Sequence, residues 1–249
     1  MISKNTKLVS FTIDGVLAVD AGSLSSELSF KEQRRIKTIL LSHGHYDHIK
    51  EVPSFIFNSL NNGLQQPIKI IASSTTNHIL KTCLFDGTIY PDYAGNNSYL
   101  GKPAVELQPL KHFQSINIEK YHITAIPVKH NIKTIGFLIS TKKKSLFYTG
   151  DTGAGLTYIW DHISPQLIIT EMTFPNRLEK VAKDSGHLCP RLLKLELQKL
   201  KKTKGYLPRV ILIHLNPHLE DEISWEIKSL TKEMGAAIEI ATEGDTYRV

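Results

Sequence analysis

The feature that most constrains how this chain can fold is a run of metal-capable side chains with the pattern H-x-H-x-D-H. The run consists of His43, His45, Asp47 and His48. It directly follows the apolar stretch 38–42, which predicts a buried β-strand with the run on the loop that leaves it. Imidazole and carboxylate groups are ligands that Zn²⁺ and its first-row neighbours bind. The fold must therefore bring these side chains together at a strand end, and a dinuclear metal site is predicted.

The spacing within the run suggests how it could serve two ions. Alternation along an extended loop puts His43 and His45 on the same side, whereas Asp47 and His48 begin the next turn. The alternative is a chance cluster in a chain that contains 11 histidines. Four other histidines are expected to be surface or structural residues: His78, His112, His122 and His162.

Composition sets only broad limits. A chain of 249 residues is long enough for one α/β domain with a large core, so a single domain over 1–249 is expected. The first residues are polar, and no stretch approaches the roughly 20 apolar residues that cross a bilayer, so we expect a soluble, cytoplasmic protein. Cys83 and Cys189 are far apart in the sequence and form no C-x-x-C pair, so neither a disulfide framework nor a thiolate zinc site is indicated. The formal charge of +6 is spread over many lysines, which favours a solvated surface over nucleic-acid binding.

Strands precede helices in each of two similar halves. In the first half, Asp14-Gly15 predicts a tight turn between strands at 8–13 and 16–19. The rest of this half is expected to contain a helix at 29–35, a strand at 38–41, a helix at 47–58, a strand at 68–72, a helix at 74–84 and a long loop around 90–97.

Apolar alternation from about Val105 predicts a meander in the second half. Its strands are expected at 115–119, 121–128, 134–140 and 145–148. A helix at 155–162, a strand at 166–170, a helix at 190–200, a strand at 210–214 and a helix at 220–234 would follow. This order fits the α/β class, as a four-layer αββα sandwich with the ligands at one edge.

The H-x-H-x-D-H run resembles the signature of the metallo-β-lactamase superfamily, and other segments match that family's motifs in order over about residues 10–248. These segments are an early strand that ends at Asp20, His130 after 126–129, Gly150-Asp151-Thr152, and His214 after 210–213. The resemblance implies the αββα fold of that superfamily and a single hydrolase domain.

Two divalent ions fit this ligand set, preferentially Zn²⁺, with Mn²⁺ or Fe²⁺ as alternatives. We assign His43, His45 and His130 to the first ion. Asp47, His48 and His214 are assigned to the second, with Asp151 bridging, although His218 could compete with His214. Such a pair of ions would supply a bridging hydroxide nucleophile. Asp20 is expected to accept a ring N–H from a ligand histidine or to hold the motif loop; the alternative is a strand-end turn residue.

The segments 170–176 and 185–190 resemble the branch of the superfamily that cleaves phosphodiesters. They contain Glu171 and His187, which we predict to be catalytic together with the ligand Asp47. His187 would stabilise the transition state or protonate the leaving alkoxide, and Glu171 would orient it and raise its pKa. The alternative is that His187 caps the helix that begins near Pro190.

Within that branch, the segments 90–92 and 213–217 add a likeness to bacterial class II cyclic-nucleotide phosphodiesterases. The likeness implies hydrolysis of 3′,5′-cyclic AMP or GMP to the 5′-monophosphate. The chain lacks the Gly-rich opening of many relatives, and Asn216 replaces a common Lys, which would remove one phosphate contact.

Several other functions stay open. A tRNase Z-like RNA 3′-end endonuclease shares nearly all these motifs, but the roughly 20 residues between His130 and Asp151 leave no room for a long tRNA-holding arm. Hydrolysis of another cyclic phosphodiester, thioester hydrolysis and a catalytically idle metal-binding module are further alternatives. The expected partner is a small cyclic nucleotide, with no membrane and no nucleic acid, and a homodimer is left open.

Overall fold

The computed structural model describes residues 6–95 and 102–249, and these fall into two compact units. The N-terminal unit is Lys7–Lys111, and the C-terminal unit comprises Thr6 and His112–Val249. Each unit has its own sheet and its own buried apolar cluster. The predicted α/β class, with two sheets and helices, is confirmed. The single domain over 1–249 stays a prediction, and the predicted loop residues Asn96 and Asn97 lie outside the described residues.

The sheet of the N-terminal unit has five strands in chain order. They are β1 (Phe11–Ile13), β2 (Leu17–Val19), β3 (Thr38–Leu40), β4 (Ile68–Ala72) and β5 (Val105–Pro109). The β1–β2 pair is antiparallel and is joined through Asp14 and Gly15, both at positive φ, as the Asp-Gly pair predicted. Strands β2 to β5 are parallel, so their carboxyl ends meet at one edge of this sheet.

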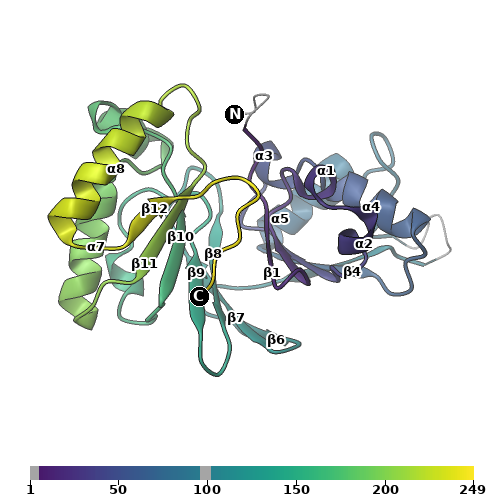
Figure 1. Ribbon diagram of the computed structural model, residues 1–249. Coiled ribbons are helices and arrows are strands. Elements are labelled where there is room, and N and C mark those ends of the chain that lie inside the picture. Colours follow the sequence, from purple (N-terminus) through teal and green to yellow (C-terminus); the bar gives the residue numbers. More distant parts are fainter. Residues whose placement is uncertain (1–5, 96–101) are drawn as a thin grey trace. The chain divides into compact units, whose positions relative to one another are not determined.

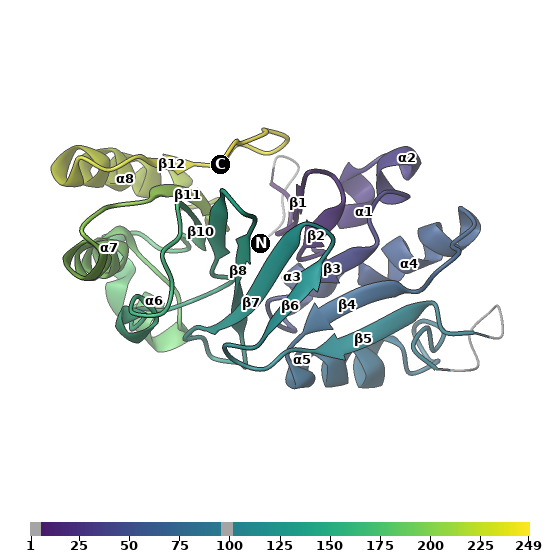
Figure 2. The ribbon, with the colours of Figure 1, turned by 90° about the horizontal axis from the view of Figure 1, so that it is seen from below.

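Helices connect these parallel strands. They are α1 (Leu24–Glu27), α2 (Phe30–Gln33), α3 (Tyr46–Ile49), α4 (Val52–Asn61), α5 (Ser74–Ile79) and the π-helical turn η1 (Leu80–Leu84) (Figure 2). The helix predicted at 47–58 is wrong in one respect, because it is divided into α3 and α4. Pro53 stands in the first turn of α4, where the backbone N–H that proline lacks would have no partner within the helix. In a continuous helix its ring would clash with the carbonyl of Ile49.

The sheet of the C-terminal unit has seven strands in the order β12-β11-β10-β9-β8-β7-β6. The predicted antiparallel meander is confirmed as β6 (Ser115–Ile118), β7 (Tyr121–Pro127), β8 (Ile135–Ser140) and β9 (Ser145–Tyr148). The strands β10 (Leu167–Glu171), β11 (Arg209–Ile213) and β12 (Ile238–Ile240) then run parallel to β9. The carboxyl ends of β7, β9, β10 and β11 therefore lie at the same edge of this sheet.

Five helical segments complete the C-terminal unit. They are the 3₁₀ turns η2 (Thr157–Ile159) and η3 (Asn176–Leu178), and the helices α6 (Glu179–Ser185), α7 (Pro190–Lys204) and α8 (Glu220–Met234) (Figure 1). The buried side chains of α7 and α8 join those of β9 to β12 in one apolar cluster. The helix predicted at 155–162 is only the short turn η2. Its apolar residues still pack into the core, so burial rather than a continuous helix explains their spacing.

Candidate metal centre

The ligand run in the N-terminal unit lies where β3 ends, and the carboxylate of Asp20 at the end of β2 holds it there. Asp20 Oδ1 accepts the backbone N–H of Ser42 at 2.8 Å, and its Oδ2 accepts the Ser42 hydroxyl at 2.8 Å. Asp20 has a φ of 52°, in the left-handed region that Asp tolerates better than most residues. The predicted function of Asp20 in holding the motif loop is therefore compatible with the observed bonds.

Asp20 also orients one candidate ligand. Its Oδ2 lies 2.7 Å from Nδ1 of His48, and both side chains are fully buried. With Nδ1 bound to the carboxylate, the second ring nitrogen of His48 is directed at Asp47, whose Oδ2 lies 3.8 Å away. A carboxylate that accepts one ring N–H of a metal-binding histidine fixes its tautomer and orientation.

His43 and His45 bring two further ring nitrogens together. Nε2 of His43 and Nδ1 of His45 are 3.0 Å apart, and the Ser42 hydroxyl lies 3.0 Å from Nδ1 of His43. Two glycines make the tight packing of this loop possible. A Cβ atom on Gly22 would stand 2.1 Å from the carbonyl oxygen of Asp47, and one on Gly44 would stand 2.6 Å from Ile79 of α5.

Three predicted ligands meet within the C-terminal unit. His130 follows β7, Asp151 follows β9 and His214 follows β11. Oδ2 of Asp151 lies 3.9 Å from Nε2 of His130 and 3.7 Å from Nε2 of His214. One carboxylate oxygen thus lies near both histidine nitrogens, and the bridging function of Asp151 stays a prediction.

The orientation of His130 depends on Gly186. The Nδ1 of His130 lies 2.8 Å from the carbonyl oxygen of Gly186. Gly186 has a φ of 73°, and a Cβ atom there would stand 3.0 Å from the Cα of His130. Burial lowers the pKa of His130, although the Gly186 carbonyl and Asp151 act in the opposite direction. A neutral imidazole is the form that binds a metal ion.

Thr173 is a site residue that the sequence interpretation did not single out. Its hydroxyl lies 3.1 Å from Nδ1 of His214 and 3.3 Å from Nδ1 of His187, and it donates to Oε2 of Glu171 at 2.7 Å. His214 itself has a φ of 57°, which is uncommon for a residue with a side chain. Thr173 therefore connects a candidate ligand with both predicted catalytic residues.

Glu171 and His187 form a direct pair. Oε1 of Glu171 lies 2.7 Å from Nδ1 of His187, and the Glu171 side chain is almost fully buried. Burial by itself lowers the pKa of His187, but the hydrogen bond and charge of Glu171 outweigh this effect, so the pKa of His187 is raised. The ring of His187 lies between those of two candidate ligands, with centroids 4.9 Å from His130 and 5.9 Å from His214.

The donor set fits divalent metal ions. The residues that could hold an ion are His43, His45, Asp47 and His48 in the N-terminal unit, and His130, Asp151 and His214 in the C-terminal unit. In three of the histidines, Nδ1 contacts a protein oxygen and Nε2 faces a carboxylate at 3.7–3.9 Å. Two ligands of one tetrahedral ion are roughly 3.4 Å apart, so these separations suit an ion between them.

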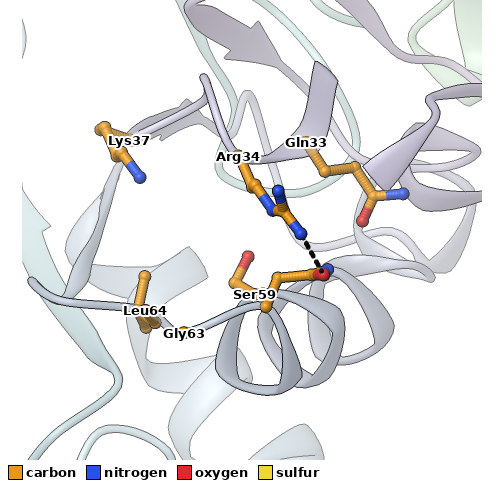
Figure 3. Close-up of a pocket in the computed structure, with 7 residues that line it drawn as sticks. Gln33, Arg34, Lys37, Ser59, Gly63 and Leu64 are labelled. Atoms are coloured by element: carbon orange, nitrogen blue, oxygen red, sulfur yellow. Dashed lines mark hydrogen bonds between the residues drawn. The ribbon is translucent and has the colours of Figure 1, made fainter. Parts of the chain in front are cut away.

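A small hollow in the N-terminal unit is not part of this site. Its lining includes Gln33, Arg34, Lys37, Ser59, Gly63 and Leu64 (Figure 3). Asn62 also lines it and accepts a hydrogen bond from Arg34. Lys37 precedes β3, whereas the ligand run follows β3, so the hollow lies at the opposite end of that strand.

Among the residues that the structure describes, no helix combines the length and the apolar character that a membrane span requires.

Comparison with known proteins places these motifs in a family context. A family model described as a β-lactamase superfamily domain matches residues 13–215. Comparison with curated proteins gives no significant match.

Three solved structures illustrate the structural likeness. Unliganded yeast PDE1 is 20% identical with a TM-score of 0.72, covering 86% of this chain and 69% of that chain. The metallo-β-lactamase fold protein YhfI from Bacillus subtilis is 18% identical with a TM-score of 0.73, covering 98% and 92%. The short form of human tRNase Z is 17% identical with a TM-score of 0.67, covering 99% and 94%. At these identities the likeness shows a shared fold.

Proposed function

We propose, from the premise that this chain belongs to the β-lactamase superfamily and is a metallo-β-lactamase-fold hydrolase, that it is a dinuclear phosphodiesterase. Its substrates would be 3′,5′-cyclic nucleotides such as cyclic AMP and cyclic GMP, and its products the 5′-monophosphates. In this proposal His43, His45 and His130 would hold one ion, Asp47, His48 and His214 would hold the other, and Asp151 would contact both.

The observation that carries the proposal is the Glu171–His187 pair. His187 is paired with a buried carboxylate and lies against two candidate ligand rings, so it would stand beside a phosphoryl group bound at the ions. Despite burial, the hydrogen bond and charge of Glu171 raise the pKa of His187 and so favour its protonated form, which can donate a proton to a leaving alkoxide. Such a donor matters for a phosphodiester, whose leaving alkoxide is strongly basic.

In this proposal three residues of the C-terminal unit have distinct functions. Glu171 accepts from Nδ1 of His187, which leaves Nε2 to carry the transferred proton. Thr173 holds the Glu171 carboxylate and the His214 ring in place. When bound, two divalent ions would stabilise the negative charge of the phosphoryl group and lower the pKa of a water toward 7, so that a hydroxide nucleophile is present at neutral pH.

The preference for a small cyclic substrate is supported by the segment between His130 and Asp151. In this structure it consists mainly of β8, β9 and short connecting turns. An RNA-processing enzyme needs an extended positive surface to hold its substrate, whereas a small ligand is recognised by a few polar groups. The fold is shared with yeast PDE1 but also with human tRNase Z, so a tRNase Z-like activity is the second candidate.

The test is a substrate panel on the protein loaded with Zn²⁺ or Mn²⁺. The panel contains 3′,5′-cyclic AMP and GMP, 2′,3′-cyclic nucleotides, a nitrophenyl phosphodiester and a precursor tRNA. We expect chelator-sensitive hydrolysis of the 3′,5′-cyclic nucleotides. Cleavage of the precursor tRNA without cyclic-nucleotide turnover would replace the proposal by the tRNase Z-like activity.

A further inference from the structure

We propose that Tyr46 is a specificity-determining residue whose ring stacks on the nucleobase of the substrate; this inference rests on the proposed function. Tyr46 stands between His45 and Asp47 in the ligand run, yet its side chain is 65% exposed. The neighbouring Asp47 side chain is itself 31% exposed, so solvent reaches this part of the loop. A large aromatic ring is thus presented to solvent within one residue of two candidate metal ligands.

The backbone beneath this ring is firmly held. The carbonyl of Tyr46 accepts the N–H of Lys50 at 2.8 Å, and that of His48 accepts the N–H of Ala21 at 2.7 Å. Gly22 packs so closely against Asp47 that no side chain would fit at that position. His48 and Ile49 anchor the buried side of α3, while Tyr46 begins its exposed side. Because the helix cannot shift freely, the position of the Tyr46 ring is restricted to its own side-chain rotamers.

The chemistry of this position favours a planar, apolar ligand group. The exposed face of a Tyr ring contributes little to the stability of the fold, but it offers a π-face on which any base can stack. A nucleotide whose phosphate is bound by ions at His45 and Asp47 would have its base several ångströms away, within reach of a neighbouring side chain. The phenolic hydroxyl keeps the ring compatible with water when no ligand is present.

The test compares a ligand that has a base with one that lacks it. The metal-loaded full chain is titrated with 5′-AMP and with ribose 5-phosphate, using the wild type, Tyr46→Ala and Tyr46→Phe. Phe57→Ala is the matched control, because Phe57 is 52% exposed in the same unit but lies on α4, outside the ligand run. Metal content is measured for every variant. Proton NMR follows the adenine H2 and H8 signals, which a stacked ring shifts upfield.

We expect Tyr46→Ala to raise the dissociation constant of 5′-AMP by about 5- to 150-fold, the usual range for one base–aromatic stack. The constant for ribose 5-phosphate should change less than about twofold by the same reasoning, and Tyr46→Phe should retain both the affinity and the upfield shift. The KM for cyclic AMP should rise in parallel, with kcat nearly unchanged. Phe57→Ala should match the wild type.

Two results would overturn the inference: equal weakening of both ligands by Tyr46→Ala, or no weakening of either. The proposed function has a separate criterion. If the wild type hydrolyses no cyclic nucleotide but binds 5′-AMP with a Tyr46-dependent upfield shift, the proposed reaction is wrong and the base-stacking function of Tyr46 stands.

Discussion

Replacing Glu171 by Gln changes one carboxylate into an amide of almost the same shape, and its effect can be worked out from four contacts. Oε1 of Glu171 faces the N–H of Thr152 at 3.2 Å and Nδ1 of His187 at 2.7 Å. Oε2 accepts from the N–H and the hydroxyl of Thr173, at 3.0 and 2.7 Å. All four partners can donate, and a carboxylate can accept from all of them. A Gln side chain has only one accepting oxygen, so one pair of partners must face its NH₂ group.

Of the two orientations of the Gln amide, the more stable one directs its oxygen toward Thr173 and its NH₂ group toward His187 and Thr152. His187 can then change tautomer and accept from the amide, but the buried N–H of Thr152 loses its acceptor. A buried donor left without a partner costs about 1–3 kcal/mol. The amide also bonds to Thr173 more weakly than the carboxylate does, but the variant no longer buries a charge, and this offsets part of that loss. We therefore expect Glu171→Gln to lower the free energy of unfolding by about 1–3 kcal/mol.

The catalytic effect is expected to be larger. In the variant, His187 becomes a neutral imidazole that accepts at Nδ1, so the proton on Nε2 is far less acidic. Loss of a positioned acid commonly reduces the rate by about 10²- to 10⁴-fold. The assays are urea unfolding of the metal-free protein, kcat with 3′,5′-cyclic AMP, whose leaving alkoxide requires a proton, and metal content.

Glu196→Gln is the matched control because Glu196 is another buried glutamate of the same unit. Its Oε1 accepts from the N–H of Gly155 at 2.8 Å and from Lys199 at 3.3 Å, while its buried Oε2 has no hydrogen-bond partner among the residues that the structure describes. A Gln can keep the Oε1 contacts, so a loss below about 1 kcal/mol and an unchanged kcat are expected. If Glu171→Gln were as stable and as active as this control, the argument from its four donors would be refuted.

Three further predictions concern the same site. His187→Ala should keep its metal content and lose turnover by about 10²- to 10⁴-fold; loss of metal would make His187 a ligand, and an unchanged rate would make it a helix cap. Elemental analysis of protein purified without chelator should approach two first-row ions per chain, and Asp151→Ala should lose at least one of them; a variant that kept both ions and full activity would contradict the bridging assignment. Gly186→Ala should destabilise the protein by about 1–3 kcal/mol in urea unfolding and weaken metal binding, because its φ of 73° and the 3.0 Å approach to His130 leave no room for a Cβ atom; unchanged stability and metal affinity would show that the loop can relax.

Local patterns were sufficient to predict the elements that carry the ligands. The apolar stretch before His43 is the buried strand β3, and the alternation near His130 is the meander β6 to β9. Asp20 was expected to contact a ligand histidine or its loop, and its carboxylate contacts both His48 and Ser42. In each case the relevant signal lies within a few residues of the element it describes.

The features that were not predicted depend on contacts between distant residues. Thr173 lies two residues after Glu171, but its contact with His214 spans 41 positions and is not visible in the local pattern. The alternation that begins at Val105 is strand β5, which pairs with the distant strand β4 in the N-terminal sheet, and β12 has only 3 residues. The spacing of Leu156, Ile159 and Trp160 suggested a helix, but packing against α7 buries these residues from a turn instead.

The most direct test of the account is the product formed from 3′,5′-cyclic AMP by the metal-loaded protein, followed by ³¹P NMR. The account predicts 5′-AMP as the product, formation that chelator abolishes, and a kcat/KM for cyclic AMP well above that for cleavage of precursor tRNA. Efficient 3′-end cleavage of the tRNA without formation of 5′-AMP would contradict it.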